Sequence, residues 1–167
     1  MGEYVRAVHE FGPVYDENSR ALILGSFPSV RSREAQFYYG HAQNRFWPLM
    51  ARLFDCPVPQ GIEEKRALML SAHVALWDVL EECEIIGSGD GSIKSPVPVD
   101  LMPLIRGSAV GAIFCNGATA YKLYNKLLYP LCSIEAVKLP STSPANAAWS
   151  MDRLYSQWRR IPEYLGL

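Results

Sequence analysis

Four short apolar runs, separated by segments with helical spacing, constrain the fold of this 167-residue chain most strongly. The runs are Ala21–Leu24, Val74–Trp77, Ala109–Cys115 and Cys132–Leu139. Each is short enough for one buried strand, and the helical patterns between them are typical of parallel βαβ units with right-handed crossovers. We therefore expect one doubly wound α/β/α domain over residues 1–167, without an internal repeat or a linker.

Helical spacing of apolar residues is clear in four of the segments between and after these runs. A polar stretch, Val30–Phe37, is suited to a short helix or a loop, and Asn44 is placed as the N-cap of the next helix. The predicted helices are Arg45–Phe54, Glu63–His73, Ala118–Leu128 and Ala147–Tyr164. Two segments fall outside the alternation. Residues 1–20 are expected to form an arm, and Glu82–Val99 a long functional loop or lid.

The composition narrows the class of protein. Hydrophobic residues make up 49% of the chain, which is enough for one sizeable core, and the net charge of −1 gives no global basic signature. A polyanion would have to be met by a local patch. Four arginines could supply it or could simply form a solvated face: Arg31, Arg33, Arg45 and Arg52.

The cysteines and the N-terminus bear on the cellular compartment. None of the four cysteines forms a C-x-x-C pair, which argues against a zinc or iron–sulfur cage and for reduced thiols. The N-terminal residues lack the apolar core of a signal peptide, and no run approaches the roughly 18 apolar residues of a membrane span. We expect a cytoplasmic protein with no metal and no membrane partner.

Polar segments follow three of the predicted strands at their carboxyl ends. They are Gly25–Ser29, Asn116-Gly117 and Ser141–Asn146. Each could be an ordinary turn or helix cap on its own. Because the carboxyl ends of parallel strands converge at one edge of a sheet, the three segments together predict a ligand crevice there.

An aromatic and amide-rich segment lies between the first strand and the first long helix. Tyr38 and Tyr39 could be core residues, but their polar surroundings favour a partly exposed platform on which a nucleobase could stack. His41 could make a structural hydrogen bond or take part in chemistry. Phe46 and Trp47 begin an amphipathic helix and are expected in the core.

Four motifs in order resemble the uracil-DNA glycosylase superfamily. They read GSFPS (25–29), YYGHAQNRFW (38–47), FCNG (114–117) and LPSTSPAN (139–146), and they are most similar to the hypoxanthine-DNA (deoxyinosine) glycosylase branch. The segment HxxNRFW also resembles the mismatch-specific uracil/thymine branch. The resemblance implies a four-stranded parallel sheet flanked by helices in a three-layer sandwich. It further implies hydrolysis of a base–sugar N-glycosidic bond in DNA that contains deaminated bases, with no cofactor.

The same resemblance assigns candidate catalytic and base-binding residues. Several branches place an Asn or Asp that positions the attacking water where this chain has Phe27, an apolar ring that cannot do so. Asn44 is then the best candidate for that role, with Ser26 and His41 as further catalytic candidates. Asn116 would read the Watson–Crick edge of the base, with Tyr39 stacking on it and Phe27 in the same base-binding group.

The last motif is similar to the segment that grips the DNA backbone in this superfamily. Ser141 and Ser143 would donate to phosphates, and Ala145 and Asn146 would lie near the wedge that enters the duplex. No lysine occurs in the first motif, so we expect simple hydrolysis by a monomer, without a Schiff base.

Three other functions remain open from the sequence. The first is a uracil or mismatch-specific glycosylase. The second is a serine hydrolase that uses Ser26 or Ser29 with His41 and Asp78 or Asp100, although the chain lacks G-x-S-x-G. The third is a flavodoxin-like nucleotide-binding module, although GSFPS has only one glycine with which to cradle a phosphate.

Overall fold

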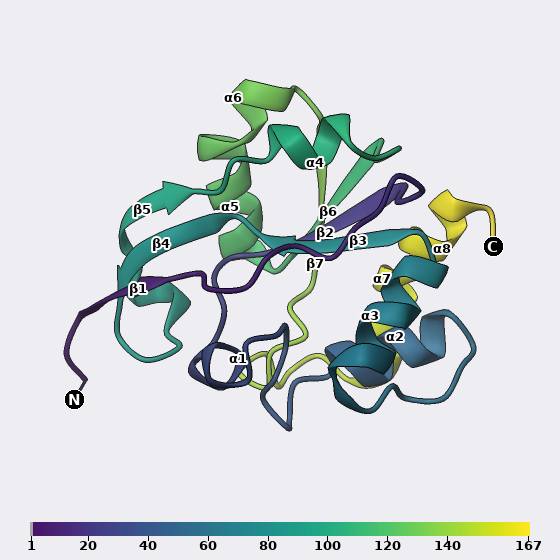
Figure 1. Ribbon diagram of the computed structural model, residues 1–167. Helices are drawn as coiled ribbons and strands as arrows, with labels where there is room; N and C mark the ends of the chain where they lie inside the picture. Colours follow the sequence, from purple (N-terminus) through teal and green to yellow (C-terminus); the bar gives the residue numbers. More distant parts are fainter. Residues whose placement is uncertain (1) are drawn as a thin grey trace.

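A four-stranded parallel sheet forms the centre of the molecule in the computed structural model, which describes residues 2–167 (Figure 1). Its strand order is β3-β2-β6-β7, with bounds β2 Ala21–Gly25, β3 Val74–Asp78, β6 Ala112–Asn116 and β7 Ala136–Leu139. All neighbouring strands in it run parallel. The predicted α/β/α architecture with a central four-stranded parallel sheet is confirmed.

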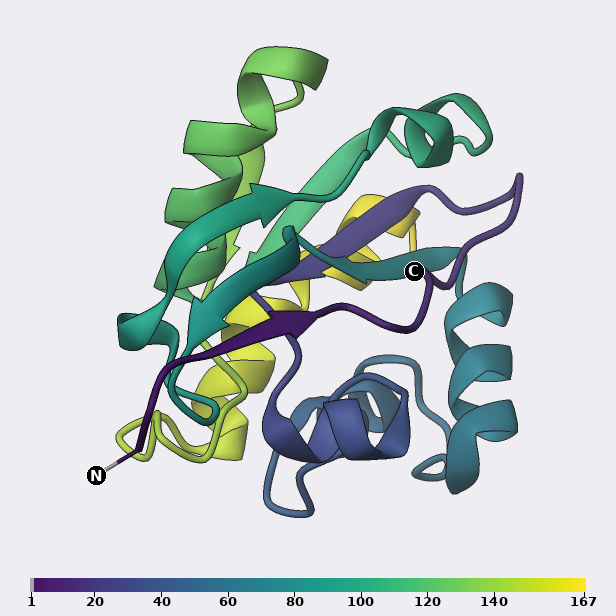
Figure 2. The same cartoon turned by 60° about the vertical axis from the view of Figure 1, so that its left-hand side comes forward.

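Helices cover both faces of this sheet (Figures 1 and 2). One side carries α2 (Phe46–Leu53), α3 (Gly61–Ser71), α7 (Met151–Trp158) and α8 (Arg160–Leu165), and the other carries α4 (Met102–Arg106), α5 (Ala118–Leu127) and α6 (Tyr129–Cys132). Strand β2 shows how the two cores arise. Ala21 and Ile23 are buried in the first core and Leu22 and Leu24 in the second, because successive side chains of a strand point to opposite faces.

A second, antiparallel sheet corrects two of the predictions. Its order is β1-β4-β5, formed by β1 (Val5–Val8), β4 (Leu80–Ile85) and β5 (Lys94–Pro98). The N-terminal arm therefore contains a strand, and the predicted lid Glu82–Val99 consists largely of β4, the short 3-10 helix η1 (Asp90–Ser92) and β5. The strands are short and partly exposed, the β4–β5 register shifts, and the edge strand β5 contains prolines. For these reasons no regular apolar alternation marks them in the sequence.

Three element boundaries also differ from the predictions. The run predicted as a strand from Cys132 begins as the end of α6, and the turn after it places Ser133 at a φ of 58°. The closing helix, predicted as a single one, is divided into α7 and α8 at Arg159. Pro162 follows shortly after this break, and it lacks the backbone N–H that a continuous helix would need there. Arg45 occupies the N-cap position of α2, and the Asn44 side chain accepts a hydrogen bond from the Phe46 N–H instead.

The connection that leaves the parallel sheet is important for the site. Strand β3 passes almost directly into β4, and the N–H groups of Val79 and Leu80 donate to the carbonyls of Gly25 and Ser26. The first motif is thereby attached to the second sheet. Within residues 2–167, no helix is long and apolar enough to cross a membrane.

Candidate active site

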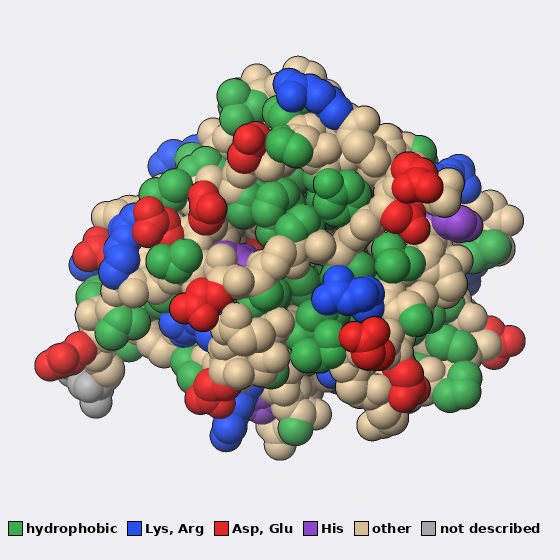
Figure 3. All heavy atoms as spheres, viewed as in Figure 1, with side chains coloured by type: hydrophobic (Ala, Val, Ile, Leu, Met, Phe, Trp, Pro, Cys, Tyr) green, Lys and Arg blue, Asp and Glu red, His purple; other side chains and the backbone are tan. Residues whose placement is uncertain are grey.

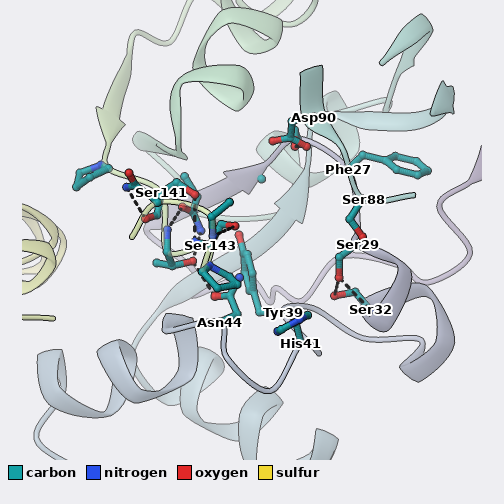
Figure 4. Close-up of a pocket in the computed structure, with 18 of the residues that line it drawn as sticks. Phe27, Ser29, Ser32, Tyr39, His41, Asn44, Ser88, Asp90, Ser141 and Ser143 are labelled. Carbon is teal, nitrogen blue, oxygen red and sulfur yellow. Dashed lines mark hydrogen bonds between the residues drawn. The ribbon is translucent and has the colours of Figure 1, made fainter. Parts of the chain in front are cut away.

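A cavity of about 970 Å³ opens at the carboxyl edge of the parallel sheet. Segments far apart in the sequence line it, and they include residues 25–29, Tyr38, Tyr39, His41, Asn44, Asp78, residues 88–90, Asn116 and residues 138–146. Figure 4 shows Asp90 and Phe27 on one side, Ser141 and Ser143 on the other, and Tyr39 between them. The three polar strand ends therefore do meet in one crevice.

Two asparagines on one side of the cavity are joined through a buried threonine. We call Asn44, Thr142 and Asn116 the amide side. The Thr142 hydroxyl donates to Asn44 Oδ1 at 2.9 Å and accepts from Asn116 Nδ2 at 3.0 Å. The Thr142 N–H donates to Asn116 Oδ1 at 3.1 Å, and Thr142 is fully buried. These bonds fix the orientation of both carboxamides before any ligand arrives.

The Asn44 carboxamide presents its donor end to the pocket. Its oxygen already accepts from the Thr142 hydroxyl and from the Phe46 N–H, the latter at 2.9 Å. Its Nδ2 makes no hydrogen bond to any residue between 2 and 167, and it is not sealed from solvent. Asn44 therefore has two N–H donors available for a ligand or a water.

Arg45 holds the loop that carries Thr142. Its guanidinium donates to the carbonyls of Ser143 at 3.0 Å and Asn146 at 3.1 Å, and also to that of Trp149. Its backbone N–H donates to the Thr142 carbonyl at 3.1 Å. This arginine stabilises the site and has little capacity left for a phosphate.

The other three arginines considered for phosphate binding also have partners within the protein. Arg31 pairs with Glu34 and Arg52 with Asp152, while Arg33 donates to the Gly87 carbonyl. Figure 3 shows positive and negative side chains interspersed over the face in view. A polyanion would therefore meet hydroxyls and backbone groups here more than a basic patch.

The hydroxyls of the 141–146 loop organise its backbone and still keep their protons free. Ser141 Oγ accepts from the Ser143 N–H and Ser143 Oγ from the Ala145 N–H, both at 3.1 Å. Asn146 Nδ2 donates to the Ser141 carbonyl at 3.0 Å, and Ala145 is exposed at the tip. Because each serine oxygen acts as an acceptor inside the loop, its O–H can donate outward.

The opposite side of the cavity is acidic. We call His9, Asp78, Ser26 and Asp90 the carboxylate side. His9 Nε2 donates to Asp78 Oδ2 at 2.8 Å, and Ser26 Oγ donates to Asp90 Oδ1 at 2.9 Å. Although Asp90 lies at an exposed rim, desolvation of its carboxyl group raises its pKa, the Ser26 hydrogen bond lowers it, and the charge of Asp78 raises it further. This side places negative charge next to the first motif.

Tyr39 lies between the two sides in a strained backbone conformation. Its φ is 53°, which is rare for a bulky residue, and its ring stacks on Phe46 with centroids 4.0 Å apart. Its hydroxyl is sealed and has no hydrogen-bond partner within residues 2–167. Burial, followed by the charge of Asp78, raises its pKa strongly, so the hydroxyl keeps its proton.

Two other aromatic residues, Tyr38 and Phe27, are more buried than a surface for base stacking would require. Tyr38 is only 2% exposed and its hydroxyl donates to the Gly12 carbonyl at 2.9 Å, so the expectation of a partly exposed Tyr38 is wrong. Phe27 is also buried, beneath the Arg33 guanidinium at 5.6 Å and beside the His9 ring. In Figure 4 its ring points away from Tyr39.

The Ser–His–Asp triad that the serine hydrolase interpretation requires is not assembled within residues 2–167. The Ser26 hydroxyl donates to Asp90, and His41 Nδ1 accepts from the Gln43 N–H at 3.1 Å. Between residues 2 and 167, His41 makes no hydrogen bond to Ser26 or Ser29. Within the same residues, no group of three or more His, Cys, Asp or Glu side chains is arranged to hold a metal ion.

Several residues of the amide side and the carboxylate side were not among the sequence candidates. Thr142 lies inside a recognised motif, yet its role depends on two partners from distant segments. Asp78 was considered only for the hydrolase interpretation, although its position directly after a buried strand was a usable signal. His9 and Asp90 come from the second sheet and its connection, which the sequence did not predict.

The fold and the site together define a class of protein. Residues 13–163 match the family model of the uracil DNA glycosylase superfamily, and the chain belongs to that superfamily. A hypoxanthine DNA glycosylase of Methanosarcina acetivorans is 34% identical over 153 residues, covering 90% of this chain and 95% of the relative.

Two further comparisons agree with this membership. A hypoxanthine DNA glycosylase of Methanosarcina barkeri is 36% identical over 85 residues, which cover 50% of this chain and 54% of that protein. The solution NMR structure of a candidate uracil DNA glycosylase from M. acetivorans has a TM-score of 0.76 and 30% identity, covering 91% of this chain and 96% of that one. The recognised family and its fold are thus confirmed.

Proposed function

We propose that this protein is a monofunctional DNA glycosylase that hydrolyses the N-glycosidic bond of deaminated bases, with hypoxanthine preferred over uracil. The observation that carries this proposal is the amide side, in which the buried Thr142 fixes the carboxamides of Asn44 and Asn116 by hydrogen bonds. This arrangement lies beside Tyr39 in a chain that belongs to the uracil DNA glycosylase superfamily. The preference for hypoxanthine is supported by the names of the two Methanosarcina relatives.

The pocket suits a nucleotide that has been turned out of the duplex. Enzymes that act on a base must extrude it and hold it by stacking and by hydrogen bonds to its Watson–Crick edge. Tyr39 would supply the aromatic surface. Asn116 retains one N–H and one lone pair after its bonds to Thr142, so its amide can still donate to the carbonyl oxygen O6 of hypoxanthine.

Asn44 is proposed to position the attacking water. One of its free N–H groups would donate to the water oxygen, whose second lone pair attacks the sugar carbon. The base leaves with the electron pair of the glycosidic bond, and the proton that the water loses passes to the base or to solvent. The contribution of Asn44 is to orient the water toward the sugar carbon. Ser26 and His41, the other catalytic candidates, line the same cavity and would assist the reaction from there. Ser26 is bonded to Asp90, and the Nε2 of His41 makes no hydrogen bond within residues 2–167.

The 141–146 loop is proposed to grip the DNA backbone. The outward O–H groups of Ser141 and Ser143 would donate to phosphates, and Ala145 and Asn146 would approach the gap left by the extruded nucleotide. We also propose that the enzyme works as a monomer in the cytoplasm; its four free cysteines fit a reducing compartment.

The proposal is tested by single-turnover incubation with labelled oligonucleotides that carry one hypoxanthine or one uracil, followed by alkali. We expect more alkali-labile product from the hypoxanthine strand than from the uracil strand. Product from uracil alone would overturn the preference for hypoxanthine. No product from either strand, with a protein shown to be folded, would overturn glycosylase activity and favour a nucleotide-binding module.

A further inference from the structure

A histidine from the N-terminal segment fixes a buried carboxylate beneath the pocket. His9 Nε2 lies 2.8 Å from Asp78 Oδ2, and the two side chains are only 2% and 5% exposed. The His9 ring packs against Phe11 and near Tyr38, and its Nδ1 is sealed without a partner within residues 2–167. Burying such a pair is a poor source of stability because of the desolvation penalty. The pair therefore calls for a functional explanation.

The second oxygen of Asp78 meets the floor of the pocket at Gly25. A Cβ placed on Gly25 would lie 2.4 Å from Asp78 Oδ1 and 3.2 Å from the Tyr39 hydroxyl oxygen, so only glycine fits there. Asp78 Oδ1 makes no hydrogen bond within residues 2–167 and is not sealed from solvent, and the buried Tyr39 hydroxyl also lacks a partner. An acceptor and a donor are thus held side by side, both unsatisfied by the protein.

Deamination changes the base at a position that a carboxylate can read. Adenine and cytosine carry a lone pair at the ring nitrogen of the Watson–Crick edge, whereas hypoxanthine and uracil carry an N–H there, beside a carbonyl. A carboxylate can only accept hydrogen bonds. It therefore attracts the deaminated ring and repels the lone pair of the adenine or cytosine from which that ring is formed.

We infer that Asp78 is a specificity-determining residue whose Oδ1 accepts the ring N–H of the extruded deaminated base, and that His9 is its positioning residue. This inference rests on the proposed function and deepens it. Asp78 and Asn116 end the strands on either side of β2, so the base edge above Gly25 would meet the carboxylate on one side and the amide on the other. The Tyr39 hydroxyl lies beside Gly25 on the same floor.

The direct test compares two DNAs that differ at the ring nitrogen. Both carry a 2′-fluoro nucleotide, whose electron-withdrawing fluorine slows cleavage, with either hypoxanthine or 1-methylhypoxanthine as the base. Binding is measured by fluorescence anisotropy, and excision is measured with the matching 2′-deoxy substrates. The variant is Asp78→Asn. His9 would hold the amide oxygen of this asparagine, so its NH2 group would face the pocket, where one N–H donor would meet the N–H donor of the base. The matched control is Asp100→Asn, because Asp100 is an exposed carboxylate outside the pocket. This variant should leave binding and excision unchanged.

We expect the wild type to prefer the hypoxanthine DNA. Asp78→Asn should weaken its binding, and slow its excision, by at least about tenfold, the effect of losing one hydrogen bond to a charged group. Binding of the 1-methyl DNA should change less than about twofold, which also shows that the variant is folded. An equal effect on both DNAs, or no effect on either, would overturn the role of Asp78. If the wild type binds but excises neither base, the proposed function fails, and the binding comparison still decides the role of Asp78.

Two His9 variants test its positioning role. His9→Phe keeps an aromatic ring beside Phe11 but removes the N–H that fixes Asp78, and it should weaken hypoxanthine binding several-fold with little effect on the 1-methyl DNA. His9→Gln restores an N–H donor and should recover part of the loss. If both variants weaken the binding of the two DNAs equally, His9 serves the fold alone and the positioning role is wrong.

Discussion

The two sides of the pocket are built from different parts of the molecule. The amide side joins the start of α2, the end of β6 and the loop after β7, and all three of its residues fall inside the recognised motifs. The carboxylate side combines the ends of β2 and β3 with the N-terminal segment and the connection between β4 and β5. The motifs therefore contain the whole amide side but only Ser26 of the carboxylate side, whose other residues lie outside them.

The two sides also differ in chemistry. The amides can donate and accept, are neutral, and are locked through one buried hydroxyl. The carboxylates only accept, carry charge, and are held as two separate pairs, of which His9–Asp78 is buried and Ser26–Asp90 lies at the rim. We therefore expect the amide side to support the reaction on every substrate and the carboxylate side to adjust selectivity and pH response.

The largest effect is expected from Asn44→Ala. It removes the only free amide donors proposed to hold the water, so single-turnover excision should fall at least about a hundredfold. Loss of the bond to the Phe46 N–H should lower the free energy of unfolding by about 1 kcal/mol. Gln43→Ala, at an exposed neighbour, is the control. Unchanged excision by a folded Asn44→Ala protein would remove this residue from the mechanism.

Asn116→Ala should have the next largest effect. It removes the amide proposed to donate to O6, and the loss of this bond should slow excision of hypoxanthine by roughly tenfold to a hundredfold. The rate is measured under single-turnover conditions at saturating enzyme. Equal rates for the variant and the wild type would refute the base-reading role of Asn116.

Thr142→Val tests whether the amide side acts as a unit. The substitution keeps the shape of the side chain but leaves Asn44 Oδ1 and Asn116 Nδ2 each without one partner. We expect a loss of about 1–3 kcal/mol in the free energy of unfolding and about tenfold in excision. Thr142→Ser retains the hydroxyl and should stay close to the wild type in both. If Val and Ser variants excise equally well, the threonine hydroxyl does not organise the amides.

The smallest effect is expected from Asp90→Asn and concerns pH. Desolvation raises the folded-state pKa of Asp90 above its ordinary value of 3.8, so the folded state binds this proton more tightly than the unfolded state. The resulting stabilisation is complete below about pH 3.8 and is lost as the pH rises through the folded-state pKa. The stability of the wild type relative to Asp90→Asn should thus fall over this range in denaturant titrations. A difference that rises with pH would contradict the raised pKa.

The sequence predicted the parallel sheet and the crevice well because both depend on local patterns. Three buried strands and the partly buried β7 appear as apolar runs, and polar residues at their ends meet whenever the strands are parallel. The roles of Thr142 and His9 depend on partners from distant segments, as in the 98-residue separation of Thr142 from Asn44. The left-handed backbone of Tyr39 and the irregular second sheet arise from tertiary packing, for which the local sequence carries no signal.

The most direct measurement is the structure of the protein bound to a duplex that contains one 2′-fluoro-2′-deoxyinosine. The account predicts that the hypoxanthine is turned out of the helix and lies above Gly25, against Tyr39, with Asn116 and Asp78 at its Watson–Crick edge. Asn44 should face the sugar, and the 141–146 loop should contact the flanking phosphates. A hypoxanthine that stays stacked in the duplex, or that lies in the pocket with its Watson–Crick edge away from both sides, would contradict the account.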